Sequence, residues 1–124
     1  DGYLTTTISG LQVPVLFDFD ATTAITESGG HVVEVTDQQA WDAQQILARQ
    51  EGLFVEPAGA TALAGVLFDL ERGNLSEDDE VIVILSGAGH KDAVSAARLG
   101  EGNPPRHIKA EEIKSVLAEF GVSP

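Results

Sequence analysis

The fold is decided by two nearby stretches of the chain: EGLFVEPAGATALAG at residues 51–65 and VIVILSGAGHKD at residues 81–92. Each begins with a short apolar run, typical of a β-strand, and continues into a turn of small residues. In an open α/β sheet, ligands bind at the carboxyl ends of strands, where small residues let the backbone come close. The two turns are therefore the best candidates for one shared site.

Strands and helices alternate along the whole chain, which predicts an α/β fold with an open, mainly parallel sheet and helices on both faces, part of a three-layer α/β/α domain. We expect strands at residues 3–8, 11–16, 31–35, 53–55 and 81–85. We expect helices at residues 20–27, from a Thr36 cap to Gly52, and at residues 57–72, 92–99 and 110–120. Residues 1–99 form the main unit, residues 100–105 a linker, and residues 106–124 a terminal helical segment.

The composition excludes several classes of protein. A chain of 124 residues with 43% hydrophobic residues suits one globular domain, and no apolar run is long enough to span a membrane. The net charge of −13 argues against nucleic acid or an anionic membrane as a partner. Zero cysteines exclude disulfides and thiol catalysis and suit the cytoplasm. Because the chain begins at Asp1 and has no methionine, we expect it to be a piece of a longer protein.

The turn after the second strand fails two tests for a nucleotide site. The stretch from Gly87 has aspartate at Asp92, where the dinucleotide motif G-x-G-x-x-G needs its third glycine. A phosphate-binding P-loop fails on the spacing of its glycines. Ser86 is then either a ligand-binding hydroxyl or part of an ordinary tight turn. Glu56, before Pro57, is either a functional carboxylate or an acidic group that favours the start of a helix.

Other candidate groups fit structural explanations. The acidic run Glu77–Glu80 lacks the alternation of a calcium loop, and the three histidines lack metal-ligand spacing. Ser86, His90 and Asp92 do not form the G-x-S-x-G elbow of a hydrolase. The small residues after Glu56 favour close packing of a helix on its neighbours. We expect no metal site and no catalytic triad.

Four segments together resemble the tryptophan-synthase β-subunit class of pyridoxal-phosphate enzymes, which includes threonine synthase and threonine dehydratase. They are SGLQVP at residues 9–14, the Thr36-Asp37 helix start, LARQEGLFVEPAGA at residues 47–60 and LSGAGHKD at residues 85–92. They cover about two-thirds of the chain in the right order, and threonine synthase is the most similar member through its Gly-Ala-Gly-His-Lys-Asp ending.

The resemblance implies a role for three residues in binding pyridoxal phosphate. Ser86 would face the pyridine nitrogen, and Gly87 and Glu56 would lie at the same part of the pocket. In this class the Schiff-base lysine lies in the N-terminal part of the full enzyme, and a separate glycine-rich loop binds the cofactor phosphate. Lys91, Lys109 and Lys114 do not match that lysine motif. The chain would then supply no catalytic residue and would be inactive alone, with residues 1–99 forming the C-terminal part of the large cofactor-binding domain.

The resemblance implies a lyase that acts on a small amino-acid substrate, and first a threonine synthase, which converts phosphohomoserine and water to threonine and phosphate. A serine or threonine dehydratase is an alternative. A non-catalytic α/β binding or assembly module is an alternative of another class. Because unpaired strand edges invite pairing, we also expect a homo-oligomer formed through strand edges or by exchange of the N-terminal segment.

Overall fold

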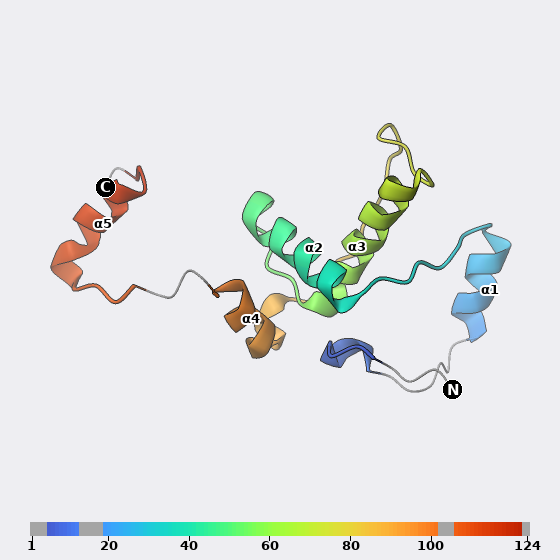
Figure 1. Ribbon diagram of the computed structural model, residues 1–124, viewed down its shortest axis with the longest axis horizontal. Helices are drawn as coiled ribbons and strands as arrows, with labels where there is room; N and C mark the ends of the chain where they lie inside the picture. The colour runs from blue at the N-terminus through green and yellow to red at the C-terminus, as the bar shows by residue number, and fades with distance from the viewer. Residues whose placement is uncertain (1–4, 13–18, 102–105, 123–124) are drawn as a thin grey trace.

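The computed structural model describes residues 5–12, 19–101 and 106–122 (Figure 1). Its α-helices are α1 (Phe19–Glu27), α2 (Asp37–Gln50), α3 (Pro57–Arg72), α4 (Ala93–Leu99) and α5 (Ile113–Glu119). Three short 3-10 turns are η1 (Ser9–Leu11), η2 (Gly89–Lys91) and η3 (Ala110–Glu112). Each helix expected from the sequence is therefore present, and the terminal one is divided between η3 and α5.

The two longest helices begin and end at the residues that local chemistry favours. The Thr36 hydroxyl accepts the backbone N–H of Gln39, and the Gln39 side chain accepts the N–H of Thr36, which completes a capping box for α2. Pro57 occupies the first turn of α3, where its missing N–H loses no hydrogen bond. Gly73 ends α3 in the left-handed region at φ 72°, which glycine adopts without strain.

The core lies between α2 and α3, which pack side by side in the middle of Figure 1. Its buried members are Ala43 and Leu47 of α2, Val55 before α3, and Ala60 and Ala64 of α3. Three of these five side chains are alanine, so the two helix backbones come close and the buried apolar volume is small. Leu63, Val35 and Leu85 pack around this centre and are only partly buried.

The open parallel sheet is not confirmed in the part of the chain that the structure describes. The pairing found there is one isolated bridge between Val55 and Ala88, and it is antiparallel. Residues 31–35 and 81–85 form no ladder, and residues 5–8 form none either. The turn η1 ends at Leu11, the first residue of the extended run expected at residues 11–16. Residues 3–4 and 13–16 lie outside the described residues.

The physical reason is visible in the exposure of the apolar runs. In residues 81–85, Ile82 and Ile84 are 93% and 75% exposed, while Val83 and Leu85 are partly buried. This alternation is the two-residue period of a β-strand with one covered face. Val32 is likewise 78% exposed. These segments have one face on the helices and no neighbouring strand among the described residues, so no ladder forms.

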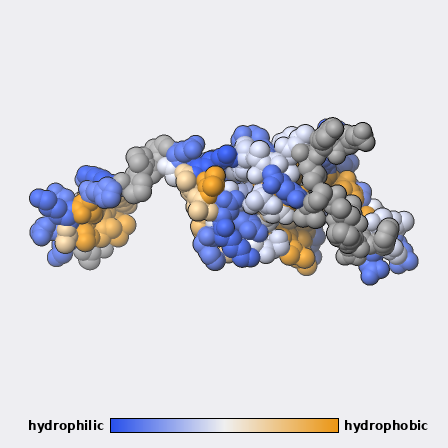
Figure 2. Space-filling model, turned by 90° about the horizontal axis from the view of Figure 1, so that it is seen from below, coloured by the Kyte–Doolittle hydropathy of each residue, from blue (hydrophilic) through white to orange (hydrophobic). Residues whose placement is uncertain are grey.

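The C-terminal helix stands apart from the α2–α3 pair. Figure 1 draws α5 at one end of the molecule, and Figure 2 shows apolar surface gathered there. Phe120 is 74% exposed and Ile113 is 45% exposed. Arg106 and Glu119 form an ion pair of 2.6 Å within this unit.

Among the helices that the structure describes, none combines the length and the apolar composition needed to cross a bilayer.

Candidate functional site

The two turns singled out from the sequence lie against each other. The Glu56 N–H donates to the Gly87 carbonyl at 3.0 Å, and the Gly89 N–H donates to the Phe54 carbonyl at 3.0 Å. These two bonds flank the Val55–Ala88 bridge, so the second turn runs antiparallel to the first. The expected closeness of the turns is observed. A role of Ser86, Gly87 and Glu56 in binding stays a prediction.

Gly87 and Gly89 in the second turn are needed because neighbouring protein atoms leave no room for a Cβ atom. A side chain at Gly87 would overlap the carboxylate of Glu56, and one at Gly89 would come within 2.6 Å of the Phe54 ring. On the α3 side, a Cβ at Gly59 would lie 3.1 Å from the backbone nitrogen of Gly87. The small residues therefore let helix, carboxylate and turn approach one another closely.

Ser86 is the group of this site that remains open to a ligand. Its side chain is exposed, and its hydroxyl takes part in no hydrogen bond within the described part of the chain. The turn that carries it lies at the first turn of α3, since a Cβ on Gly59 would be 3.4 Å from the Ser86 nitrogen. A hydroxyl can donate or accept, so Ser86 can bond either a protonated or an unprotonated ring nitrogen.

Glu56 is the N-cap residue of α3, and its side chain makes no capping hydrogen bond. The half-buried carboxylate instead lies over Gly87, next to the first turn of the helix. Both interpretations of Glu56 therefore remain: a negative charge that favours the helix start, and a functional carboxylate next to the Ser86 turn.

Gln44 supports the turn that carries Glu56, and the sequence analysis did not identify this residue. Its side chain is 1% exposed, and its Nε2 donates to the Val55 carbonyl at 2.7 Å. The only available signal is that Gln44 falls on the apolar face of α2 with Ala40, Ala43 and Leu47. A polar residue at a core position needs a hydrogen-bond partner. The sequence does not say which partner it has.

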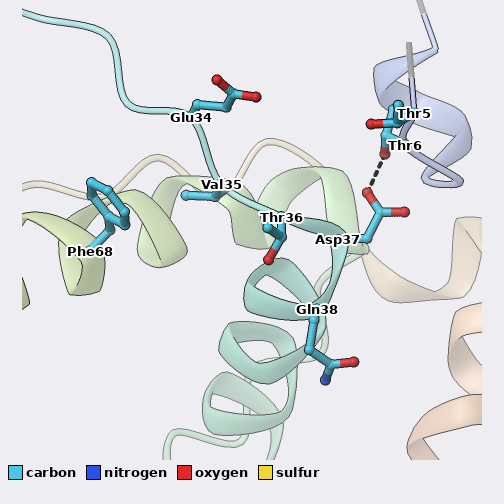
Figure 3. A pocket seen from close by; sticks show the side chains of 8 residues that line it. All are labelled: Thr5, Thr6, Glu34, Val35, Thr36, Asp37, Gln38 and Phe68. Carbon is cyan, nitrogen blue, oxygen red and sulfur yellow. Dashed lines mark hydrogen bonds between the residues drawn. The ribbon is translucent and has the colours of Figure 1, made fainter. Parts of the chain in front are cut away.

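The sequence analysis identified Asp37 only as part of a helix start, but the residue also binds a distant segment. Its carboxylate accepts the Thr6 hydroxyl at 2.5 Å and the Thr7 N–H and hydroxyl at 2.7 Å each. Figure 3 shows Asp37 directed toward Thr6 at the edge of a cavity of about 560 Å³, which is lined also by Glu34 and Phe68. The hydrogen bond from Thr6, and then those from Thr7, hold the pKa of the Asp37 carboxyl below its ordinary value.

The charged residues that follow the Ser86 turn either cap a helix or are exposed. Asp92 caps α4: its Oδ1 accepts the N–H groups of Val94 and Ser95 at 3.1 Å, and its Oδ2 accepts the Ser95 hydroxyl at 2.8 Å. These bonds from Ser95 and then Val94 lower the pKa of Asp92. Lys91 and His90 are exposed in η2. The carboxylate of Asp92 is thus engaged with its own helix.

A contact between the exposed His31 and the buried Asp69 ties the stretch before α2 to the end of α3. The His31 Nε2 lies 2.8 Å from Oδ2 of the buried Asp69, and Asn74 Nδ2 donates to its Oδ1 at 2.9 Å. The bond from Asn74 first, and then His31, lowers the pKa of Asp69. Within the described ranges, no group of three His, Cys, Asp or Glu side chains is arranged to hold a metal ion.

The sequence of the chain is similar to those of known proteins. The family described as pyridoxal-phosphate dependent enzyme matches residues 2–87, which include Glu56, Ser86 and Gly87. The chain is 39% identical over 97 residues to threonine synthase of Methanocaldococcus jannaschii and 37% identical over 84 residues to threonine synthase of Halalkalibacterium halodurans. It is 28% identical over 88 residues to cysteate synthase of Methanococcoides burtonii.

These matches cover most of the chain and a small part of each relative. They take in 78%, 68% and 71% of the chain, in the same order, and 24%, 24% and 20% of the three relatives. The chain thus spans about a quarter of the length of the threonine synthases that it matches.

Proposed function

The chain belongs to the family of pyridoxal-phosphate-dependent enzymes, and on this basis we propose that it forms the side of the cofactor site that faces the pyridine nitrogen. Ser86 would bond that nitrogen, with Gly87 and Glu56 beside it. The observation that supports this role is the exposed Ser86 hydroxyl, which has no partner among the described residues, at the start of α3. When bound, the cofactor supplies an electron sink for bonds at the substrate α-carbon. A neutral hydroxyl moderates this sink because it stabilises a pyridinium less than a carboxylate does.

We propose threonine synthase as the activity of the full-length protein: phosphohomoserine and water give threonine and phosphate. The likeness to two threonine synthases supports this reaction over the likeness to a cysteate synthase, which is weaker in identity. A serine or threonine dehydratase is the alternative reaction. Residues that bind the substrate are not assigned, and the substrate class is a small amino acid.

The chain alone would not catalyse. Its lysines, Lys91, Lys109 and Lys114, do not match the Schiff-base motif of the class, so that lysine and the phosphate loop would lie in the rest of the protein. Residues 1–99 would be the C-terminal part of the cofactor-binding domain, residues 100–105 a linker, and residues 106–124 a terminal helical segment. A non-catalytic binding or assembly module is the alternative of another class.

The proposed sheet would form in the full-length protein, where strands from other regions pair with residues 31–35 and 81–85. The half-covered alternation of residues 81–85 supports this arrangement. Without such strands, the free edges would pair between copies or exchange the N-terminal segment, which gives a homo-oligomer. We place the protein in the cytoplasm because it has no cysteine, and its charge of −13 disfavours nucleic acid and anionic membranes as partners.

The test uses the full-length protein with Ser86→Ala, Ser86→Thr and, as a matched control, Ser28→Ala on an exposed serine outside the site. We expect bound pyridoxal phosphate in the unmodified protein and in the three variants, and phosphate release from phosphohomoserine. Loss of one hydrogen bond of about 1.4 kcal/mol lowers kcat about tenfold in Ser86→Ala. Ser86→Thr keeps the hydroxyl and should keep the rate.

Three results would contradict the proposal. Absence of cofactor binding would exclude the family's chemistry for this protein. Equal rates in Ser86→Ala and Ser28→Ala would remove the role of Ser86. Deamination of serine or threonine without phosphate release would favour the dehydratase. Light scattering of the same preparations measures the oligomeric state.

A further inference from the structure

We propose that Asp37 is a positioning residue of the cofactor site, which holds the segment Thr6–Leu11 as a wall between the first turn of α3 and the end of the Ser86 turn. The proposal concerns the position of a chain segment at the proposed cofactor site, and it therefore rests on the proposed function. Asp37 itself is assigned no contact with the cofactor or the substrate.

Asp37 fixes the beginning of this segment through both of its carboxylate oxygens. Oδ1 accepts the Thr6 hydroxyl (Figure 3). Oδ2 accepts both the N–H and the hydroxyl of Thr7. The Thr6 hydroxyl also accepts the N–H of Ile8 at 3.1 Å. Ile8 is then buried, with 4% of its surface exposed. Three charge-assisted bonds to one carboxylate leave the segment a single position at this end.

The middle of the segment contacts the first turn of α3. A Cβ on Gly10 would lie 2.9 Å from the Cβ of Ala58, so only glycine permits this approach. Ala58 comes two residues after Glu56, the carboxylate that covers Gly87. Leu11 lines a cavity together with Thr61, one turn further along α3. The segment therefore lies against the helix face that begins at the proposed site.

The other side of the segment faces the end of the Ser86 turn. Ser9 and Thr7 line a cavity of about 230 Å³ together with Asp92, Ser95 and Arg98. Asp92 directly follows η2, which continues from the Ser86 turn. The segment thus contacts the first turn of α3, which follows Glu56, and lies beside the start of α4, which follows the Ser86 turn. A shift of the segment would remove its contacts on both of these sides.

Arg98 links the Asp37 contact to the rest of the site. Its guanidinium lies 3.5 Å above the ring of Trp41 on α2, and its charge acts on both Asp37 and Asp92. This arrangement holds α4, which follows the Ser86 turn, near the helix that carries Asp37. The segment Thr6–Leu11, α2 and α4 are joined through these groups.

The experiment compares Asp37→Asn with Asp42→Asn in the full-length protein. Asp42 lies on the same helix and accepts only a surface hydrogen bond from Gln38. We expect the Kd for pyridoxal phosphate to rise about tenfold in Asp37→Asn, because small displacements of a supporting group weaken a site strongly. Asp42→Asn should bind like the unmodified protein. Hydrogen exchange at residues 6–11 should increase in Asp37→Asn alone, also without cofactor.

A second pair of variants keeps the test decisive if Asp37→Asn does not fold. Thr7→Val removes one donor to Asp37, and Thr7→Ser restores it. Thr7→Val should raise the Kd and the hydrogen exchange, and Thr7→Ser should return both to the original values. A purely stabilising role would lower the Tm without changing the Kd of the folded protein.

The outcomes separate the two proposals. If the unmodified protein binds no pyridoxal phosphate, the proposed function fails and this inference fails with it. If the unmodified protein binds and Asp37→Asn binds equally well, only the positioning role of Asp37 is overturned. Equal Kd values for Thr7→Val and Thr7→Ser overturn it as well.

Discussion

The facing sides of α2 and α3 and the stretch 81–85 both carry apolar side chains, yet only those between the helices are buried. Ala43 is 0% exposed and Leu47 is 7% exposed, whereas Ile82 is 93% exposed. The helices satisfy their own backbone hydrogen bonds and need only one partner, which each supplies to the other. A strand of a parallel sheet needs neighbouring strands on its edges and cover on both faces of the sheet. An apolar strand sequence therefore predicts a buried strand, but the elements that bury the strand must come from other parts of the protein.

The largest expected effect is the difference in stability between a substitution in the helix core and one in residues 81–85. Leu47→Ala removes a buried side chain and should lower the free energy of unfolding of the 124-residue chain by about 2–4 kcal/mol. Ile84→Ala removes a side chain that is 75% exposed and should change it by less than about 0.5 kcal/mol. Urea unfolding followed by the fluorescence of Trp41 measures both values.

The same pair of substitutions sharpens the comparison in the full-length protein. There Ile84→Ala should become as destabilising as a core substitution, because the proposed sheet covers its side chain. Equal losses from Leu47→Ala and Ile84→Ala in the 124-residue chain would show that residues 81–85 are already buried without further strands.

A smaller effect is expected where the α2–α3 pair meets the candidate site. Gln44→Leu leaves the Val55 carbonyl without its 2.7 Å donor and should lower the free energy of unfolding by about 1–3 kcal/mol. Gln38→Leu on the exposed face of the same helix removes only a surface bond to Asp42 and should change little. Urea titration gives both values. A neutral result for Gln44→Leu would mean that the Val55 carbonyl finds another donor.

The smallest expected effect per residue is the dependence of stability on pH. The pKa values of Asp37, Asp69 and Asp92 are lower in the folded chain than their ordinary value of 3.8. The unfolded chain therefore binds protons first as the pH falls, so the stabilisation is complete above this value and is lost below it, down to the lowered pKa values. The urea midpoint should be constant near neutral pH and fall below about pH 4.

Asp69→Asn provides the control for this dependence, because it removes one of the three carboxylates while keeping a similar shape. Its urea midpoint should fall less steeply in the acid range than that of the unmodified chain. A midpoint that falls with the same slope in both proteins would assign the acid loss to other groups.

The helices were predictable because their signals are local. The Thr36 capping box, the first-turn Pro57 and the final Gly73 each act within one helical turn. The same local chemistry placed Glu56 and Ser86 at the ends of apolar runs. The sheet could not be predicted to form in the described residues, since the pairing of a strand depends on other strands. Of the predicted fold, the family and the helices are confirmed, and the open parallel sheet is not confirmed in the described residues.

The supporting residues of the candidate site escaped prediction for a related reason. Gln44 has the sequence position of a core residue, and Asp37 that of an ordinary helix-start residue. Their partners, Val55 and the Thr6–Thr7 pair, lie 11 and about 30 positions away in the chain. Such partners become neighbours only after α2 packs beside α3.

By itself, the sequence determined where helices begin and end, which runs are apolar, and which small and polar residues follow them, because these depend on each residue and its near neighbours. Only the tertiary structure decided that the Ser86 turn folds back antiparallel on Phe54–Glu56 and that Gly87 lies beneath the Glu56 carboxylate. It also decided that Asp37 holds the segment beside α3. Hydrogen bonds and close contacts between distant segments require both segments to be placed, and local propensities leave that placement open.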